Sequence, residues 1–89
     1  MNAQAAEKKV AAAGREITVA KANSWLGSKD ACFRAGVDPA KMWACSSFAN
    51  GMIYEPSGFY RTLNELVADQ IEIAENNDAA RDFFYGKEA

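Results

Sequence analysis

The feature that most constrains the fold is an apolar seam at helical spacing near the start of the chain. The seam consists of Ala6, Val10, Ala13, Ile17 and Ala20, at intervals of four, three, four and three residues. Such spacing is a heptad seam, and it predicts one long helix over residues 3–26. Because most of the seam is alanine, whatever packs against it comes close. Gly27 follows as the residue that ends this helix.

Further along the chain, glycine and proline residues separate two shorter predicted helices. Ser28 is a suitable N-cap for a helix that ends at Gly36. Asp38 caps the next helix, and Pro39 occupies its first position, where a missing N–H costs nothing. We expect this helix to continue to residue 50. After it, residues 52–54 fit a short extended strand, and a Pro-Ser-Gly turn follows.

The second half of the chain predicts two more helices. A wide apolar stripe and the capping-box pair Thr62 and Glu65 indicate a helix that starts near residue 58 or 62. Residue 77 or 78 caps a last short helix that ends at Tyr85. The chain, residues 1–89, is therefore expected to be one all-α domain, a compact bundle of about five helices with one long N-terminal helix.

The composition is that of an ordinary globular protein, with 49% hydrophobic and 25% charged residues. Its charge is unevenly divided. Residues 1–50 carry seven basic and four acidic side chains, a net charge of +3, whereas residues 51–89 carry three basic and eight acidic side chains, a net charge of −5. We expect the two halves to attract each other within one fold or between copies. The alternative is a basic face that meets an acidic partner.

Catalytic chemistry is not expected from this composition. A zinc site or a catalytic cysteine needs ligands or a base that a chain with two cysteines and no histidine does not supply. Carboxylates such as Glu65 and Asp69 have the spacing of a solvated helix face. We therefore expect a protein that is not an enzyme and has no catalytic residue, metal or cofactor. Cys32 and Cys45 are interpreted as buried free thiols.

The chain shows no sequence signal for a membrane. Its apolar runs fall short of the ~20 residues that a membrane span needs. The first residues lack the apolar centre of a signal peptide. These two observations predict a cytoplasmic protein without a membrane partner.

Residues 28–47 contain a pattern that resembles a helix-turn-helix unit. Gly36 falls on the turn, and Asp38 with Pro39 opens the second helix. Small or apolar residues fall where such a motif packs its helices together, at Ala31, Ala35, Val37, Met42 and Cys45. The resemblance implies DNA contacts through Lys41 and Ser47, and phosphate contacts through Lys29 and Arg34. The outward positions of the second helix offer few of the forked donors that read base edges.

Exposed aromatic residues favour a protein partner instead. Three aromatic residues in a row, residues 83–85, span about 200° of a helix, so a single core cannot take all of them. Aromatic side chains that face outward are typical anchors of interfaces. The expected partner-binding residues are Trp43, Lys41, Arg81, Phe83, Phe84 and Tyr85. The alanine seam also suits a homodimer or a higher oligomer.

These observations lead to a primary hypothesis and two alternatives about function. The primary hypothesis is a small non-enzymatic protein-binding module. In size and composition it is similar to compact proteins of phages and mobile elements that inhibit or regulate a host protein machine. The first alternative is a helix-turn-helix DNA-binding regulator, either a small repressor or a packaging-type adaptor. The second is a protein that binds a small anionic ligand through the basic groups of residues 1–50.

Overall fold

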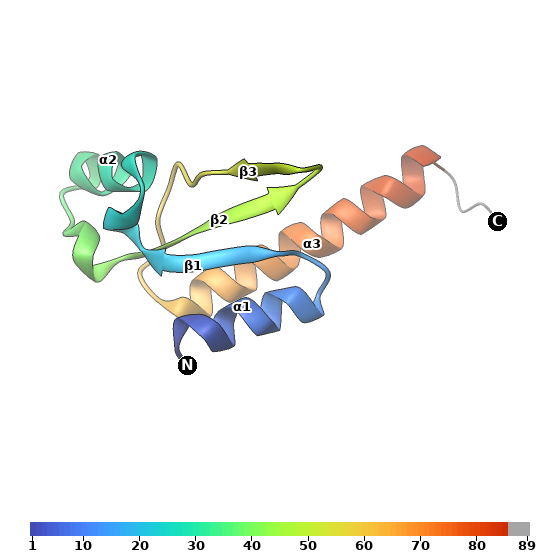
Figure 1. The fold of residues 1–89 in the computed structure, drawn as a ribbon, viewed down its shortest axis with the longest axis horizontal. Coiled ribbons are helices and arrows are strands. Elements are labelled where there is room, and N and C mark those ends of the chain that lie inside the picture. Colours follow the sequence, from blue (N-terminus) through green and yellow to red (C-terminus); the bar gives the residue numbers. More distant parts are fainter. Residues whose placement is uncertain (86–89) are drawn as a thin grey trace.

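A computed structural model shows a mixed α and β fold, in which helices cover one face of a small sheet (Figure 1). It describes the backbone of residues 1–85 and the side chains of residues 1–76. The helices are α1 (Ala3–Ala12), α2 (Leu26–Ala35) and α3 (Leu63–Tyr85), with short 3₁₀ helices η1 (Ala22–Ser24) and η2 (Pro39–Lys41). The strands are β1 (Ile17–Lys21), β2 (Trp43–Ala49) and β3 (Met52–Tyr54).

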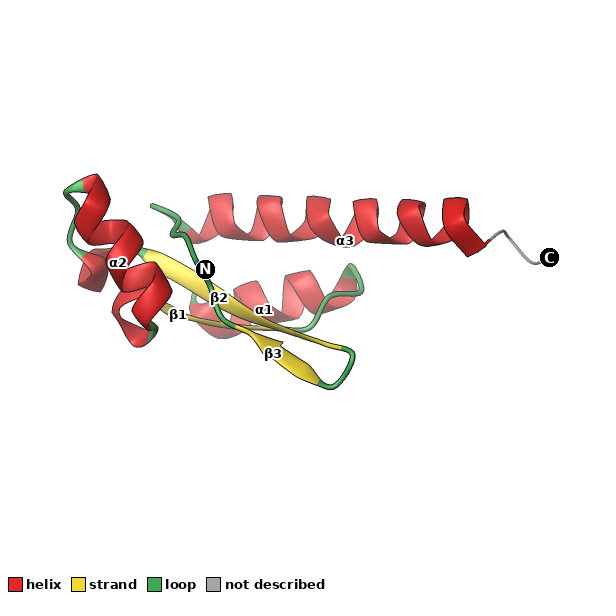
Figure 2. Cartoon of the chain, turned by 90° about the horizontal axis from the view of Figure 1, so that it is seen from above, coloured by secondary structure: helices red, strands yellow, loops and turns green. Residues whose placement is uncertain are grey.

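The strands form an antiparallel sheet in the order β1-β2-β3. Helices α1 and α3 pack against each other on one face, whereas α2 lies at one end of the sheet (Figures 1 and 2). The register pairs Val19 with Cys45, and Phe48 with Ile53. Because side chains alternate along a strand, Val19 and Cys45 face the helices, while Phe48 and Ile53 face the other side. No helix covers that other side at the β2–β3 hairpin (Figure 2).

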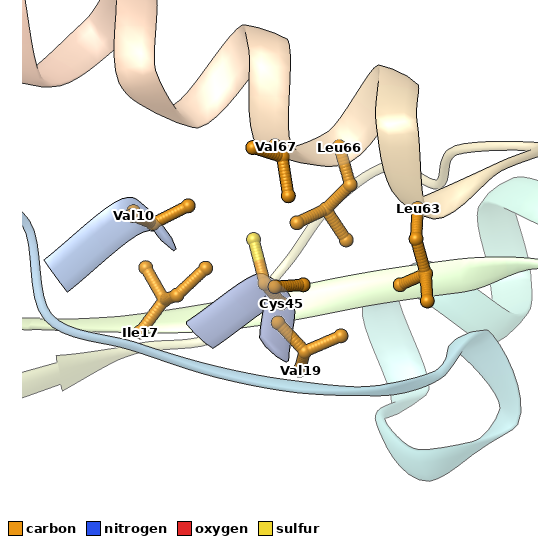
Figure 3. Close-up of a cluster of buried hydrophobic side chains, with 8 residues drawn as sticks. Val10, Ile17, Val19, Cys45, Leu63, Leu66 and Val67 are labelled. Atoms are coloured by element: carbon orange, nitrogen blue, oxygen red, sulfur yellow. The ribbon is translucent and has the colours of Figure 1, made fainter. Parts of the chain in front are cut away.

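The main core lies between the sheet and the two helices. Side chains from α1, β1, β2 and α3 converge there (Figure 3). The buried members of this core are Ala6, Val10, Ile17, Val19, Cys45, Leu63, Leu66 and Val67. Leu66 and Val10 are the largest of them with no exposed surface. A second, smaller cluster of Ala22, Cys32 and Ala44 fixes α2 against the end of the sheet.

The predicted helix over residues 3–26 is wrong, because the chain leaves the helix after Ala12 and forms β1. Gly14 has a φ of 100°, which favours glycine and turns the chain back. Ile17, Thr18 and Val19 are then three consecutive β-branched residues, which prefer an extended backbone. The predicted seam therefore does not form as one helical stripe, although Ala6, Val10 and Ile17 of it enter the core, Ile17 from a strand instead of a helix.

The prediction of a second helix in the helix-turn-helix unit is also wrong. Helix α2 ends as expected, with Gly36 at a φ of 74°, and Asp38 caps η2 by accepting a hydrogen bond from the Ala40 N–H at 3.0 Å. After that one turn the chain extends into β2. Residues 42–54 contain no charged side chain, and they alternate across the sheet, so pairing with β1 and β3 outweighs the helical signal. The fold is therefore not an all-α bundle of five helices.

In the C-terminal half, the short extended strand expected at residues 52–54 is confirmed as β3. The Thr62 hydroxyl accepts a hydrogen bond from the Glu65 N–H at 3.1 Å, as the capping-box spacing predicts. The two predicted helices of this half are one continuous helix, α3. Its C-terminal part extends beyond the sheet and α1 in both views (Figures 1 and 2). The molecule is accordingly elongated, with extents of 49 × 24 × 21 Å.

Candidate functional site

The most distinctive surface is a group of exposed apolar side chains on the β2–β3 hairpin. This hairpin surface consists of Phe48, Met52, Ile53 and Tyr54, whose side chains are 48%, 55%, 69% and 46% exposed. No charged residue occurs between residues 42 and 54. Isolated exposed apolar residues are common on protein surfaces, but four on one uncharged hairpin, two of them paired across the strands, are a distinctive concentration.

The hairpin turn explains why these residues come together. Asn50 and Gly51 have φ values of 55° and 76°, as a two-residue type I′ turn requires. This turn matches the twist of the strands and fixes the register, in which Ala49 pairs with Met52. Phe48 and Ile53 therefore lie side by side on the sheet face away from α1 and α3, beyond the end that α2 covers at Ala44, while Met52 and Tyr54 lie on the opposite face.

A shallow hollow accompanies Phe48 and Ile53 on the open face of the sheet. Its volume is about 360 Å³, and it is lined by Glu16, Ile17, Thr18, Ser46, Ser47, Phe48 and Ile53. Thr18 and Ser46 form a cross-strand pair at its floor. The hollow thus combines the apolar side chains of Phe48 and Ile53 with hydroxyl groups and the carboxylate of Glu16, so it offers both apolar and polar contacts to another protein.

A polar network lies on the opposite, helix-covered face. The Arg15 Nε–H donates to Gln70 Oε1 at 2.7 Å, and the Gln70 Nε2–H donates to the Tyr60 hydroxyl at 3.2 Å. Tyr60 in turn donates to the Asp69 carboxylate. The network connects the start of β1, the segment after β3 and α3. The network supplies hydrogen-bond partners for the buried side chain of Gln70, so its role is structural.

Burial keeps the thiol and the phenol of this network, and the separate thiol under α2, protonated at neutral pH. Burial raises the pKa of Cys45 to about 11, with Arg15 opposing and Asp69 adding to the shift. Burial, together with the hydrogen bond to Asp69, raises the pKa of Tyr60 to about 12. Burial also raises the pKa of Cys32. A cysteine nucleophile needs a thiolate, so neither thiol is activated here.

A pocket of about 370 Å³ opens beside this network. It forms because pairing with β2 ends where β3 ends, at Tyr54, and resumes only at Tyr60, whose backbone pairs with Trp43. Arg15, Cys45, Ser47 and Glu55 are among its lining residues. The opposite charges of Arg15 and Glu55 leave the pocket without a strong preference for an anion, and we assign it no ligand.

Trp43, an expected interface anchor, is half buried at the start of β2. It packs against the main core, and the Lys21 Nζ lies 3.8 Å from the centre of its ring. This cation–π contact and the backbone pairing with Tyr60 already engage both the ring and the main chain. Lys41, the neighbouring candidate, is exposed in η2.

The remaining candidates for DNA contact do not share one surface. Lys29 and Arg34 are exposed on α2, where the Lys29 Nζ lies 6.0 Å from the centre of the Phe33 ring. Ser47 lies on β2, on the side that faces Arg15 and the polar pocket. A helix-turn-helix contact with the major groove needs a second helix, and β2 stands in its place. We therefore propose no DNA contact for these residues.

The other expected anchors belong to the last turns of α3. Arg81, Phe83, Phe84 and Tyr85 have a helical backbone, and their side chains lie outside the described residues. Sequence reasoning missed the hairpin surface, although its signal was present. An Asn-Gly pair between two uncharged apolar stretches is a strong short-range hairpin signal, and it stands at residues 50–51.

Two other kinds of feature concern the part of the chain that the structure describes, a metal centre and a membrane span. Within it, histidine, cysteine and carboxylate residues form no group of three that could hold a metal ion. None of the helices there has the length and apolar character needed to cross a membrane. Comparison of the chain with protein-family models, curated proteins and solved structures finds no match.

Proposed function

We propose that the protein is a small non-enzymatic protein-binding module that contacts its partner through the hairpin surface. The observation that carries this proposal is the exposure of Phe48 and Ile53 side by side on one face of an uncharged hairpin, with Met52 and Tyr54 exposed on the other face. Contiguous exposed apolar patches mark interaction sites on soluble proteins. Phe48 and Ile53 flank the hollow on the open face, and they are its two natural anchors.

The two anchors supply part of the energy that specific binding needs. Complete burial of a phenylalanine or isoleucine side chain contributes about 1.5–3 kcal/mol. Phe48 and Ile53 are 48% and 69% exposed, so roughly half to two-thirds of that gain is still available to a partner at each residue. Aromatic and large aliphatic anchors at the centre of an interface contribute most of its affinity.

The chemistry of the hairpin defines the kind of partner. Residues 42–54 carry no charge, so a charged partner surface would lose its hydration there without gaining an ion pair. We infer a protein partner that presents an uncharged, apolar surface to Phe48 and Ile53. Compact phage and mobile-element proteins that inhibit or regulate a host protein machine are similar in size and composition, and such a role is our proposal for the biological setting.

The absence of enzyme activity is part of this proposal. Its support is chemical, since burial raises the pKa of both thiols and the chain contains no histidine to act as a base. The polar network of Arg15, Gln70 and Tyr60 is engaged in internal hydrogen bonds. These groups support the fold beneath the sheet instead of offering a free acid or base.

A matched set of variants tests the proposal. The wild-type protein, a Phe48→Ser/Ile53→Ser variant and a Leu26→Ser/Phe33→Ser control are immobilised and exposed to nuclease-treated bacterial lysate. The control removes two apolar side chains, 72% and 60% exposed, from α2 instead of the hairpin. We expect the wild type and the control to retain the same protein and the hairpin variant to lose it.

The affinity of the purified partner then gives the quantitative result. We expect the hairpin variant to bind at least about tenfold more weakly, which corresponds to about 1.4 kcal/mol. We also expect little change in affinity between about 50 and 500 mM salt, because the contact is uncharged. Loss of binding in the α2 control with retention in the hairpin variant would contradict the proposal, as would a steep dependence on salt.

A further inference from the structure

Strand β3 is an edge strand, and the backbone groups of its central residue, Ile53, face away from the sheet. The Phe48 N–H donates to the Glu16 carbonyl oxygen at 3.2 Å, so the backbone of Phe48 faces β1. Ile53 lies opposite Phe48 on the β3 side. In an antiparallel pair, residues at such a position do not bond to each other, and their backbone groups point outward. The N–H and C=O of Ile53 therefore point out at the edge of the sheet.

The other edge of the sheet is protected. The outward N–H of Val19 on β1 donates to Glu7 Oε2 at 2.7 Å, and α1 packs along the same strand. A carboxylate that occupies this donor blocks the approach of a further strand, a common way to protect an edge. Of the two edges of this sheet, β3 is thus the one whose central residue keeps its donor and acceptor available.

We propose that two copies of this chain pair through their β3 strands, antiparallel, with Ile53 at the two-fold axis. The outward N–H and C=O of Ile53 in each copy would bond to those of Ile53 of the partner subunit. The two sheets would then join into one continuous sheet. Such an interface uses the same residues on both sides, as two-fold symmetry requires.

Side chains fit this register on both faces. Met52 would lie opposite Tyr54 of the partner subunit, and Tyr54 opposite Met52 of the partner subunit. Sulfur–aromatic contacts are favourable, and the Tyr54 hydroxyl already lies 4.0 Å from the Met52 sulfur within one chain. Glu55 would lie opposite Gly51 of the partner subunit, so no like charges face each other.

Charge is the reason to prefer a second copy as the occupant of this edge. Like surfaces usually repel because their charges match, but residues 42–54 carry none. The hairpin is therefore complementary to itself, and the exposed apolar side chains of β3 would cover one another. A contact of a three-residue strand is smaller than the ~20–30 residues a side of standard interfaces, so we expect a weak, reversible dimer.

The dimer goes beyond the proposed function. It would bring Phe48 and Ile53 of both copies into one apolar platform on the open face, which remains available to a partner. The two proposals can fail separately, since the dimer is tested on the purified protein alone. A protein that stays monomeric would leave the partner-binding proposal intact.

Sedimentation velocity of the purified full chain, from about 1 µM to about 1 mM, tests the dimer in the concentration range expected of weak contacts. The variants are Ile53→Pro, which removes the outward N–H, and Ile53→Lys, which places like charges at the axis. Proline is tolerated at sheet edges, and the lysine variant keeps the backbone intact. Phe33→Lys on α2 is the control. Circular dichroism confirms that each variant is folded.

We expect the wild type and the control to dimerise with increasing concentration, and both Ile53 variants to do so at least about tenfold more weakly. A wild type that remains monomeric at about 1 mM, or folded Ile53 variants that dimerise like the wild type, would overturn the proposal.

Oxidative cross-linking tests the register. Residues at a hydrogen-bonded antiparallel position have Cα atoms about 5.5 Å apart, within the range for a disulfide. An Ile53→Cys variant is therefore expected to form a covalent dimer rapidly, and a Phe33→Cys variant is not. The native thiols are buried and do not compete. Equal cross-linking rates in the two variants would refute the register.

Discussion

Replacement of Gly27 by alanine tests the packing that directs the chain from β3 to α3. Gly27 lies within α2, where alanine is ordinarily more stable than glycine by about 1 kcal/mol. However, a Cβ atom at this position would overlap the carbonyl oxygen of Pro56. Because Pro56 contributes a backbone atom, no side-chain rotation relieves the overlap, and such overpacking costs about 1–3 kcal/mol or more.

The clash therefore exceeds the gain in helix propensity. We expect Gly27→Ala to lower the free energy of unfolding by about 1–2 kcal/mol, which corresponds to a fall in Tm of roughly 5–15 °C for a chain of this size. The measurement is urea and thermal unfolding followed by circular dichroism. Gly58→Ala is the matched control, because a Cβ there meets no atom within 4 Å. A Gly27→Ala variant that is more stable than the wild type would refute the reasoning.

Two further predictions concern the edge of β1 and the groups beneath the sheet. Glu7→Ala removes the acceptor of the Val19 N–H and should lower the free energy of unfolding, measured in urea, by about 1.5–3 kcal/mol. Glu7→Gln should lower it by less, because glutamine keeps an acceptor. Equal losses in the two variants would contradict the hydrogen bond. Burial raises the pKa of Cys45 from 9.0 to about 11 and that of Tyr60 from 10.0 to about 12, so both groups hold their protons more tightly in the folded state. The free energy of unfolding should accordingly be constant below about pH 9 and fall between about pH 9 and 12, and a flat profile over that interval would contradict the assignment.

The parts of the fold that depend on local signals could be predicted from the sequence. Gly36 ends α2, Asp38 caps η2, and Thr62 caps α3, because each effect involves residues within one turn of each other. The short strand at residues 52–54 was also predictable, since a Pro-Ser-Gly turn limits it. The burial of Cys32 and Cys45 followed from the ordinary behaviour of free cysteine.

The sheet could not be predicted by the same reasoning, because its stability comes from pairing between distant residues. Ile17 has helical spacing from Val10 and also alternates with Val19, so periodicity alone leaves both structures open. Pairing of β1 with β2 and burial against Leu66 decide the outcome, and neither contact is local. The hairpin surface was missed for a different reason, because the local Asn-Gly signal at residues 50–51, which brings Phe48 and Ile53 together, was overlooked in favour of a helix.

Hydrogen exchange of the protein with and without its purified partner would test the role of the hairpin surface most directly. At dilutions where the protein is monomeric, we expect the partner to slow exchange at the β2–β3 hairpin, around Phe48 and Ile53, and to leave α2 unchanged. Slower exchange confined to α2 or α3, with none at the hairpin, would contradict the assignment of the binding surface.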